Sequence, residues 1–309
     1  MATAPRANKI WVDGKLIPWD QATVHVTAHA LHYGSSVFEG IRAYELPSGP
    51  AVFRLREHVD RLFNSCKIYR LPIPFSKAQV GQAILDTVAA NGHKSCYIRP
   101  LVIRGPGPLG VDGRNSPTNV YILTWEWGKY LGADALEKGV EVGVSSWRRM
   151  APDTFPAMAK IGGNYINSQF IRAEAATHNY AEGIALDVSG YVSEGSGENL
   201  FLVRDGQLWT PPVATSILDG ITRGSVITLA EEMGLKVHER QIPREMLYIC
   251  DELFFTGTAA EITPIRAVDG IEVGNGRRGP ITGKLIEAFF AILDGKVPDR
   301  HQWLTPVST

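Results

Sequence analysis

The sequence has few of the features that mark several large classes of protein. Its 309 residues include three cysteines, Cys66, Cys96 and Cys250, which are far apart and have no C-x-x-C spacing. This indicates buried thiols in a reducing compartment, and neither a disulfide framework nor a zinc site. No run of about 18 apolar residues is present, so a transmembrane helix is not expected. The short polar segment Met1–Asn8 leaves no room for a secretory signal, and we expect a cytoplasmic protein with no membrane partner.

An excess of charge of either sign is also lacking. Lys and Arg number 31 and Asp and Glu 32, giving a net charge of -1. No basic run of the kind that follows a phosphate backbone is present, which argues against a nucleic-acid partner. Apolar residues make up 44% and charged residues 20%, as in ordinary globular proteins. The length is about twice that of a typical single domain, so two lobes with a cleft between them are expected.

Local patterns predict a mixed fold with a change of character near the middle of the chain. Asp13-Gly14, Asp205-Gly206 and Asp269-Gly270 each predict a two-residue hairpin turn. Apolar periodicity and capping signals predict helices, and runs of β-branched or alternating residues predict strands. The predicted helices are Glu57–Leu71, Ser76–Asn91, Asn164–Tyr180, Thr222–Met233 and Thr282–Leu293. The predicted strands are Lys9–Trp19 as a hairpin, Cys96–Arg104, Asn119–Trp127, Val140–Trp147, Ile184–Val188, Asn199–Val203, Lys236–Gln241 and Glu252–Phe255.

These elements predict an α+β (mixed α/β) fold with two domains. Residues 1–128 form a small α+β domain in this interpretation, and the looser segment 129–138 is an interdomain loop. Residues 139–309 form a larger, strand-rich domain covered by helices.

Three short patterns point elsewhere but carry little weight. Gly105–Gly110 and Gly274–Gly279 both match G-x-G-x-x-G, yet the first contains two prolines that lack amide hydrogens, and too few residues follow the second for a dinucleotide-binding unit. The spacing of His25, His29 and His32 could suit a metal, but no cysteine or clustered carboxylate joins them, so packed or hydrogen-bonded rings are expected and no metal.

One lysine stands out in the second half of the chain. Lys160 is the only lysine between Gly139 and Leu235, and Met158, Ala159, Ile161 and two glycines surround it. A buried lysine has a lowered pKa and can form a Schiff base with an aldehyde. A solvated lysine in a loop fits the local sequence equally well.

A set of longer motifs carries a resemblance to a known family. Met158-Ala-Lys160-Ile-Gly-Gly-Asn-Tyr165 closely resembles the cofactor-lysine motif of the class IV (fold type IV) pyridoxal-phosphate enzymes. Tyr191–Phe201, Leu218–Arg223 and Thr256–Glu261 follow in the family's order, and the match spans nearly the whole chain. The resemblance implies a two-lobed fold with the active site between a smaller N-terminal and a larger C-terminal domain, and pyridoxal 5′-phosphate as the cofactor.

The resemblance also implies cofactor-binding residues, each of which makes physical sense. Lys160 would carry the cofactor as an internal aldimine, and Glu194, on a strand, would accept the proton of the pyridine nitrogen. Arg61 would reach the phosphate with a planar fork, although it could instead belong to a solvated helix face, and Glu194 could be an ordinary surface carboxylate. Tyr165, one helical turn beyond Lys160, would meet the phenolic oxygen of the ring. The remaining cofactor residues are Leu218, Gly220, Ile221 and Thr222, where a helix opens and can bind the phosphate, and Thr258 with its hydroxyl.

Three further motifs resemble branched-chain amino-acid aminotransferases in particular. They are Tyr33–Tyr44, Tyr97-Ile-Arg99 and Leu109-Gly110-Val111. The resemblance implies an apolar pocket in which Arg99 binds the side-chain carboxylate of glutamate, and Tyr97 with the amides near Thr258 and Ala259 binds the α-carboxylate. The implied substrate-binding residues are Tyr33, Phe38, Gly40, Arg42, Tyr97, Arg99, Val111, Trp127, Tyr130, Gly257, Thr258 and Ala259.

The implied activity is reversible transfer of the amino group of leucine, isoleucine or valine to 2-oxoglutarate, with ping-pong kinetics. In relatives, Tyr33 and the 109–111 loop come from a neighbouring subunit, so we expect a homo-oligomer, either a dimer or a hexamer built of dimers. Two alternatives remain open from the sequence. One is a D-amino-acid or (R)-amine aminotransferase of the same fold, and the other is a catalytically dead cofactor-binding protein.

Overall fold

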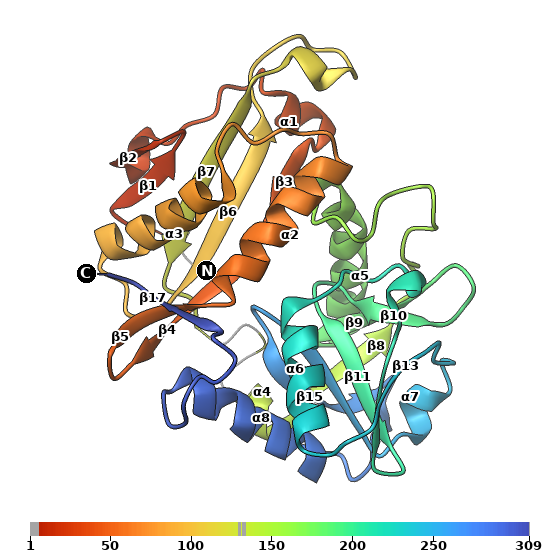
Figure 1. Cartoon of the computed structure of the whole chain (residues 1–309). Coiled ribbons are helices and arrows are strands. Elements are labelled where there is room, and N and C mark those ends of the chain that lie inside the picture. The colour runs from red at the N-terminus through yellow and green to blue at the C-terminus, as the bar shows by residue number, and fades with distance from the viewer. Residues whose placement is uncertain (1–5, 129–130, 132–133, 309) are drawn as a thin grey trace. The chain divides into compact units, whose positions relative to one another are not determined.

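The computed structural model describes residues 6–128, 131 and 134–308. Its contacts divide the chain into two compact units, and most of their elements are labelled in Figure 1. Unit 1 comprises Met1–Trp127, Ala159–Gly163 and Ile292–Thr309, and unit 2 comprises Gly128–Met158 and Asn164–Ala291. Each unit contains both helices and strands, which confirms the predicted mixed α/β class.

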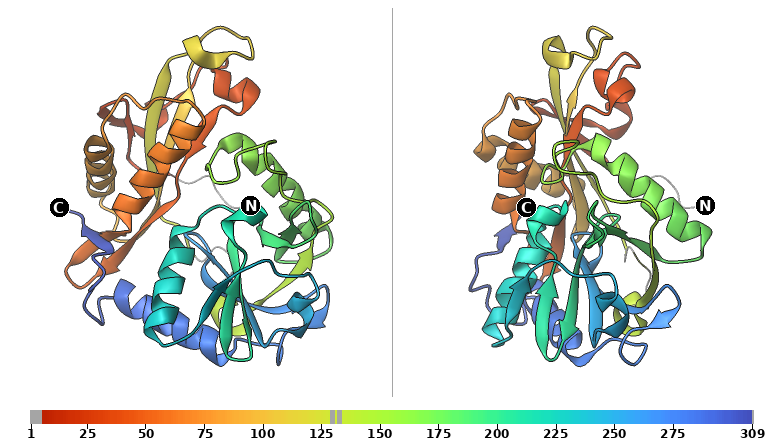
Figure 2. Two further views of the ribbon diagram at one scale, coloured as in Figure 1. Left: turned by 45° about the vertical axis from the view of Figure 1, so that its right-hand side comes forward. Right: turned by 90° about the vertical axis from the view of Figure 1, so that its right-hand side faces the viewer.

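Unit 1 is built on an antiparallel sheet with the strand order β17-β5-β4-β6-β7-β1-β2, and β3 pairs with β6. Its eight strands among the described residues are β1 (Lys9–Val12), β2 (Lys15–Pro18), β3 (Ser36–Phe38), β4 (Ile41–Leu46), β5 (Gly49–Phe53), β6 (Cys96–Arg104), β7 (Thr118–Trp125) and β17 (Leu304–Pro306). Its helices there are α1 (His29–Tyr33), α2 (Leu55–Ile68) and α3 (Lys77–Asn91). Helices α2 and α3 pack against each other and against strands of this sheet (Figure 2).

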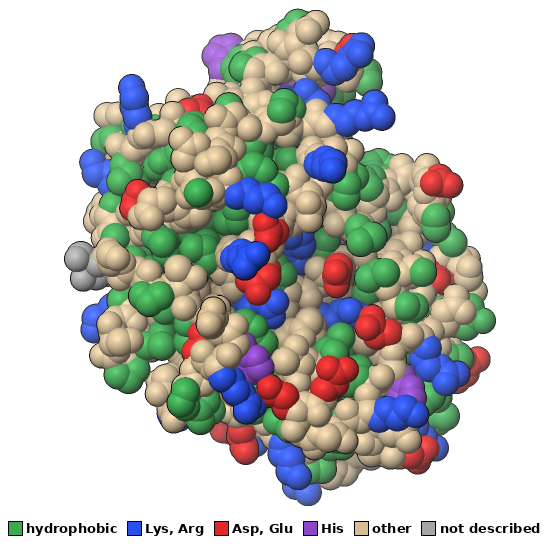
Figure 3. Space-filling model, in the orientation of Figure 1, with side chains coloured by type: hydrophobic (Ala, Val, Ile, Leu, Met, Phe, Trp, Pro, Cys, Tyr) green, Lys and Arg blue, Asp and Glu red, His purple; other side chains and the backbone are tan. Residues whose placement is uncertain are grey.

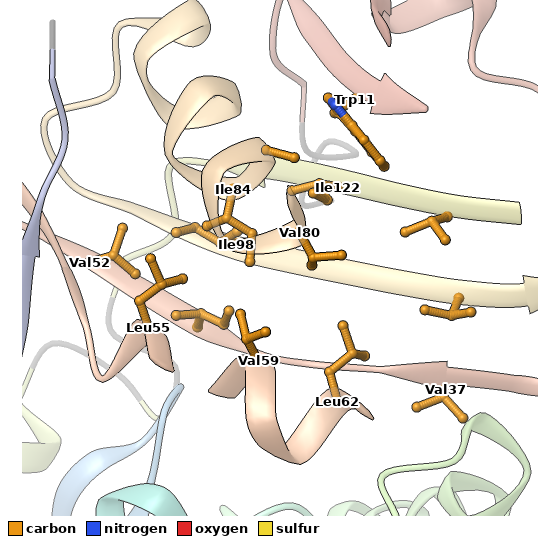
Figure 4. Close-up of a cluster of buried hydrophobic side chains, with 14 of the residues drawn as sticks. Trp11, Val37, Val52, Leu55, Val59, Leu62, Val80, Ile84, Ile98 and Ile122 are labelled. Carbon is orange, nitrogen blue, oxygen red and sulfur yellow. The ribbon is translucent and has the colours of Figure 1, made fainter. Parts of the chain in front are cut away.

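The core of unit 1 lies between this sheet and the two longer helices (Figure 4). Leu55, Val59, Leu62 and Cys66 follow the helical period along α2, and all four are buried. Sheet residues such as Ile98 face them in the same cluster. This packing fixes α2, and the polar residues between the apolar ones therefore have defined positions.

Unit 2 is built on a mixed sheet with the strand order β10-β9-β8-β15-β14-β11-β12-β13, and β16 pairs with β15. Its nine strands among the described residues are β8 (Val140–Val144), β9 (Glu182–Leu186), β10 (Val192–Gly195), β11 (Asn199–Arg204), β12 (Gln207–Thr210), β13 (Val237–Glu239), β14 (Glu252–Gly257), β15 (Glu261–Val268) and β16 (Ile271–Glu272). Its helices there are α4 (Ala135–Lys138), α5 (Tyr165–Thr177), α6 (Ile221–Glu232), α7 (Met246–Ile249) and α8 (Pro280–Leu293), whose last two residues fall in unit 1. Helix α5 packs on β9 and β8, and α6 on β14 and β13 (Figure 2).

Most of the predicted elements are present, with shifted ends. The strand predicted at Cys96–Arg104 coincides with β6, and the predicted hairpin turn at Asp13-Gly14 has positive φ at both residues. Helix α3 begins after Ser76, whose side chain forms a capping box with Gln79, and ends at Gly92 with φ 65°. Helix α2 begins two residues before the predicted Glu57 and ends at Ile68.

The predicted interdomain loop, 129–138, lies partly outside the described residues, and its last four residues form α4 instead of loop. The domain boundaries stay a prediction. The compact units differ from those boundaries because β17 pairs with β5 and because residues 159–163 are hydrogen-bonded to β3 and α2.

No helix among the described residues is long and apolar enough to cross a membrane. On the face drawn in Figure 3, acidic and basic side chains are interspersed, as a net charge of -1 would lead one to expect.

Candidate active site

Lys160 lies in a short segment of unit 1, after a turn, whose backbone is held on both sides. Its amide N–H donates to the Ser65 hydroxyl of α2 at 3.0 Å, and its carbonyl accepts from the Phe38 amide at 3.1 Å. The next residue, Ile161, forms a β-bridge with Val37. The position of the Lys160 backbone is therefore defined by α2 and by β3.

The amine of Lys160 lies in a poorly solvated, partly aromatic environment. Nζ is 4.9 Å from the centroid of the Phe38 ring, and the residue is half-buried. Desolvation, with a further contribution from the positive charge of Arg61, lowers the pKa of Lys160 to about 8. Of the two interpretations that the sequence left open, the structure fits the buried amine. An amine with this pKa is largely protonated at neutral pH but gives up its proton far more easily than a solvated lysine.

Arg61, the predicted phosphate ligand, lies on α2 in a two-pronged ion pair with Glu39. Its Nε and Nη2 donate to the two carboxylate oxygens of Glu39 at 2.7 and 2.9 Å. His58 Nδ1 donates to the same carboxylate at 2.7 Å. Both Arg61 and His58 lower the pKa of Glu39 far below its usual range, against the opposing effect of burial, and burial lowers the pKa of His58. Glu39 is therefore a carboxylate and His58 a neutral ring at neutral pH.

Predicted substrate residues from β3, from β6 and from the segment after β7 form an aromatic cluster around Arg99. The Arg99 guanidinium lies 4.6 Å from the Phe38 ring centroid and 5.3 Å from that of Tyr97. Trp127 and Tyr97 make an edge contact with ring centroids 4.7 Å apart. Nη2 of Arg99 donates to the Tyr97 hydroxyl at 3.3 Å, whereas its Nε is buried without a hydrogen-bond partner among the residues described. A pocket with apolar walls and one charged hydrogen-bond donor can accommodate either an apolar side chain or a carboxylate.

Gly40 and Arg42 border this cluster. A Cβ atom on Gly40 would lie 2.0 Å from the Tyr97 hydroxyl, so only glycine allows the Tyr97 ring its place. Arg42 is buried on β4 and is the register partner of Tyr97 on β6.

Tyr33 and Val111 lie together at another part of unit 1, where both are exposed, at 44% and 83%. The Tyr33 hydroxyl donates to the Leu109 carbonyl at 3.3 Å. Nε2 of the buried His29 donates to the Gly110 carbonyl at 3.0 Å, and its Nδ1 accepts from the Ser35 hydroxyl at 2.6 Å. His29 thus holds the 109–111 loop against α1. No group of three metal-ligating side chains is found among the described residues.

In unit 2, Glu194 lies on β10 with both carboxylate oxygens engaged. Oε2 accepts from the Asn199 side-chain amide at 3.0 Å and from the Leu218 backbone amide at 3.1 Å. Oε1 lies 3.3 Å from Nη2 of the buried Arg149. Two hydrogen-bond donors and the ion pair with Arg149 fix the orientation of the carboxylate.

The predicted phosphate residues of unit 2 lie at the start of α6. This helix begins at Ile221 after Gly220, and no side chain caps its N-terminus. A Cβ on Gly220 would lie 1.9 Å from Oδ1 of Asn199, so the close approach of these two elements requires glycine. The amides of Ile221 and Thr222, together with the helix dipole, make this end a suitable anion site. Gly257, Thr258 and Ala259 are half-buried where the chain turns from β14 into β15.

One expectation about the geometry of the predicted site residues changes. Tyr165 begins α5, but Lys160 is not helical and a 3-10 turn, Gly162–Asn164, separates the two residues, so the prediction that they are one helical turn apart is wrong. Tyr130 lies outside the described residues.

Sequence reasoning assigned no role to Glu39, His58, Arg149 or Asn199, which orient the predicted residues. Glu39 and Asn199 stood inside the recognised motifs, whereas nothing in the local sequence distinguished His58 or Arg149 from surface residues.

Comparisons with known proteins cover almost the whole chain. The family model described as amino-transferase class IV matches residues 36–268. The chain belongs to the class IV aminotransferases.

Relatives of this class IV aminotransferase include the branched-chain-amino-acid aminotransferase of Salmonella typhimurium, 52% identical over 311 residues, which cover 99% of this chain and 100% of the relative. The crystal structure of the branched-chain amino acid aminotransferase from Escherichia coli is 52% identical, with a TM-score of 0.97 over 98% of this chain and 100% of that one. The branched-chain amino acid aminotransferase from Thermobaculum terrenum, solved in its PLP-form, is 36% identical, with a TM-score of 0.92 over 99% and 100% of the two chains.

Proposed function

We propose that this class IV aminotransferase is a branched-chain amino-acid aminotransferase that uses pyridoxal 5′-phosphate and carries it on Lys160. The observation that carries the proposal is the full-length similarity, at 52% identity, to enzymes of that activity. The same similarity disfavours a D-amino-acid or (R)-amine aminotransferase. The amine of Lys160 argues against a dead binding protein, because its lowered pKa suits proton transfer.

The residues present fit the cofactor in both units. The Lys160 amine is desolvated, the α6 start offers uncapped amides, and the Glu194 carboxylate is held by two hydrogen-bond donors and an ion pair. When bound, pyridoxal phosphate supplies an electron sink that stabilises negative charge developing on the substrate's α-carbon. Glu194 would accept a hydrogen bond from the protonated ring nitrogen and so favour the cationic form of that nitrogen.

The phosphate and the ring oxygen have their own ligands in this proposal. Arg61 and the Ile221 and Thr222 amides bind the phosphate, Leu218 and Gly220 border it, and the Thr258 hydroxyl adds a donor. The Tyr165 hydroxyl donates to the phenolic oxygen of the ring. Nζ of Lys160 then serves as the base that accepts the proton from the substrate's α-carbon, for which a pKa near 8 is well matched.

The substrate pocket is proposed to select for both apolar and acidic side chains. Phe38, Tyr97 and Trp127 supply apolar surface for leucine, isoleucine and valine, and Gly40 with Arg42 borders it. Arg99, whose Nε is buried without a partner among the described residues, binds the side-chain carboxylate of glutamate or 2-oxoglutarate. The Tyr97 hydroxyl and the Gly257–Ala259 amides bind the α-carboxylate.

The finer points of the proposal concern assembly, acceptor and location. We infer a homo-oligomer, either a dimer or a hexamer built of dimers, to which the exposed Tyr33 and Val111 contribute across a subunit contact. The amino acceptor is 2-oxoglutarate, the kinetics are ping-pong, and the enzyme acts in the cytoplasm. A fully active monomer in sedimentation analysis would contradict the oligomer.

The visible absorption spectrum of the purified protein tests the activity. We expect a cofactor band that bleaches on addition of L-leucine and returns on addition of 2-oxoglutarate, which would establish the donor class and the acceptor together. No change with leucine but bleaching with D-alanine or an (R)-amine would assign the protein to the rival subtype. The absence of any band after incubation with pyridoxal phosphate would contradict the assignment of Lys160.

A further inference from the structure

The buried carboxylate of Glu39 has no role in the function proposed above, yet it accepts hydrogen bonds from two side chains, one of them charged. Its relative exposure is 0%, and it accepts from Arg61 through two nitrogens and from His58 through one. A bidentate pair of this kind fixes the guanidinium plane, because both N–H directions are committed to one partner. The opposite edge of the Arg61 fork then points in a defined direction.

The backbone of Lys160 is attached to both elements that carry this pair. Ser65, which accepts from the Lys160 amide, is four residues beyond Arg61 on α2 and so lies on the same helix face. Phe38, which donates to the Lys160 carbonyl, directly precedes Glu39. The Glu39–Arg61 pair therefore has a fixed position relative to the lysine.

The charges that act on the Lys160 amine come from these elements and from β6. Arg61 on α2 and Arg99 on β6 disfavour its proton, whereas Glu39 and Tyr97 favour it. His58, also on α2, is neutral because burial lowers its pKa. The negative charge of Glu39 thus opposes the lowering of the Lys160 pKa by two nearby guanidinium groups.

We propose that Glu39 is a positioning residue for Lys160: it holds the Arg61 guanidinium in one orientation and partly offsets the effect of the Arg61 charge on the lysine amine. This inference rests on the proposed function only in that Lys160 is taken as the cofactor lysine. It assigns to Glu39 an electrostatic role beyond filling the core.

The proposal distinguishes charge from packing. Glu39→Gln keeps the shape and part of the hydrogen bonding but removes the negative charge, which leaves Arg61 uncompensated beside the amine. Glu39→Asp keeps the charge. His58→Asn replaces one neutral hydrogen-bond partner of Glu39 by another, and it serves as the matched control for a change in the same buried cluster.

The test measures the pKa of Lys160 in the full-length protein without cofactor, by competitive labelling with trace acetic anhydride over a range of pH and mass spectrometry of the Lys160 peptide. We expect Glu39→Gln to lower this pKa by about 0.5 or more, Glu39→Asp to stay close to the wild type, and His58→Asn to leave it unchanged. A pKa in Glu39→Gln equal to that of the wild type would overturn the proposal, as would an equal drop in His58→Asn.

A second comparison does not require Glu39→Gln to fold beside an uncompensated Arg61. In Arg61→Gln, the carboxylate acts on Lys160 without its counter-charge, and in the double variant Glu39→Gln/Arg61→Gln both charges are gone. We expect a higher Lys160 pKa in Arg61→Gln than in the double variant, and equal values would overturn the proposal. Because labelling needs no cofactor or substrate, a failure here is distinct from a failure of the proposed function, which would appear as a missing cofactor band.

Discussion

Replacing Gly40 with alanine should impair substrate binding through a single steric contact. The new Cβ would lie 2.0 Å from the Tyr97 hydroxyl and 2.9 Å from its Cζ, whereas ordinary contacts begin near 3.4 Å. The hydroxyl must therefore move by about 1.4 Å. The Tyr97 ring is buried against Trp125 and Trp127, with centroids 4.9 and 4.7 Å away, so it cannot move without disturbing the cluster and the contact with Arg99.

The proposed role of Tyr97 gives the magnitude of this effect. A hydrogen bond to a charged group contributes about 1.5–3 kcal/mol, which corresponds to about 10- to 150-fold in kcat/KM for L-leucine. Steady-state kinetics of Gly40→Ala would measure it, with the cofactor band and thermal unfolding to verify that the protein is loaded and folded. A kcat/KM indistinguishable from that of the wild type would refute the assignment of Tyr97 to the substrate carboxylate.

Gly81→Ala is the matched control. Gly81 lies inside α3, and a Cβ there would meet no atom within 4 Å. We expect unchanged kcat/KM and a gain in stability of about 0.5–1 kcal/mol, because alanine loses less backbone entropy than glycine in a helix.

Three further predictions concern cofactor binding and pH. Asn199→Ala removes the donor that joins Glu194 to the Leu218 carbonyl and should weaken cofactor binding by about tenfold, as read from an absorbance titration. Folding lowers the pKa of Lys160 from 10.5 to about 8, so the unfolded chain binds this proton more tightly than the folded protein does. Without cofactor, Lys160→Met should therefore be more stable than the wild type at neutral pH. This difference in stability should disappear as pH rises from about 8 to about 10.5. Burial, followed by the charge of neighbouring Glu182, raises the pKa of Glu198 from 4.5 to about 8. Glu198→Gln should therefore become more stable relative to the wild type as pH rises from 4.5 to about 8. Denaturant titrations in which the two proteins keep the same difference in stability over this pH range would contradict the prediction.

Elements with strong local signals were predictable from the sequence. Helix α3 has a capping box at Ser76 and Gln79 and a terminal glycine at Gly92, and the Asp13-Gly14 turn needs positive φ at both positions. Strand β6 is a nearly continuous apolar run because it is buried between β4 and β7. In these segments the local preference and the tertiary environment agree.

Features that depend on distant partners were not predictable. The pairing of β17 with β5 joins the end of the chain to unit 1, and no local pattern specifies such a partner. The position of the Lys160 backbone depends on its hydrogen bonds to Phe38 and Ser65, which are distant in sequence. The Glu39–Arg61 pair joins residues that are 22 positions apart, and the two side chains meet only when the core is packed. The resemblance named Arg61 and Lys160, and the structure adds the residues that orient them.

The most direct test of the central claim is to reduce the protein with sodium borohydride after incubation with pyridoxal phosphate, digest it, and locate the phosphopyridoxyl group by mass spectrometry. Reduction fixes the cofactor to whichever amine holds it. The structure predicts the label on the peptide that contains Lys160 and its loss in Lys160→Ala. A label on another lysine, or none on a protein that still transaminates leucine, would contradict the account.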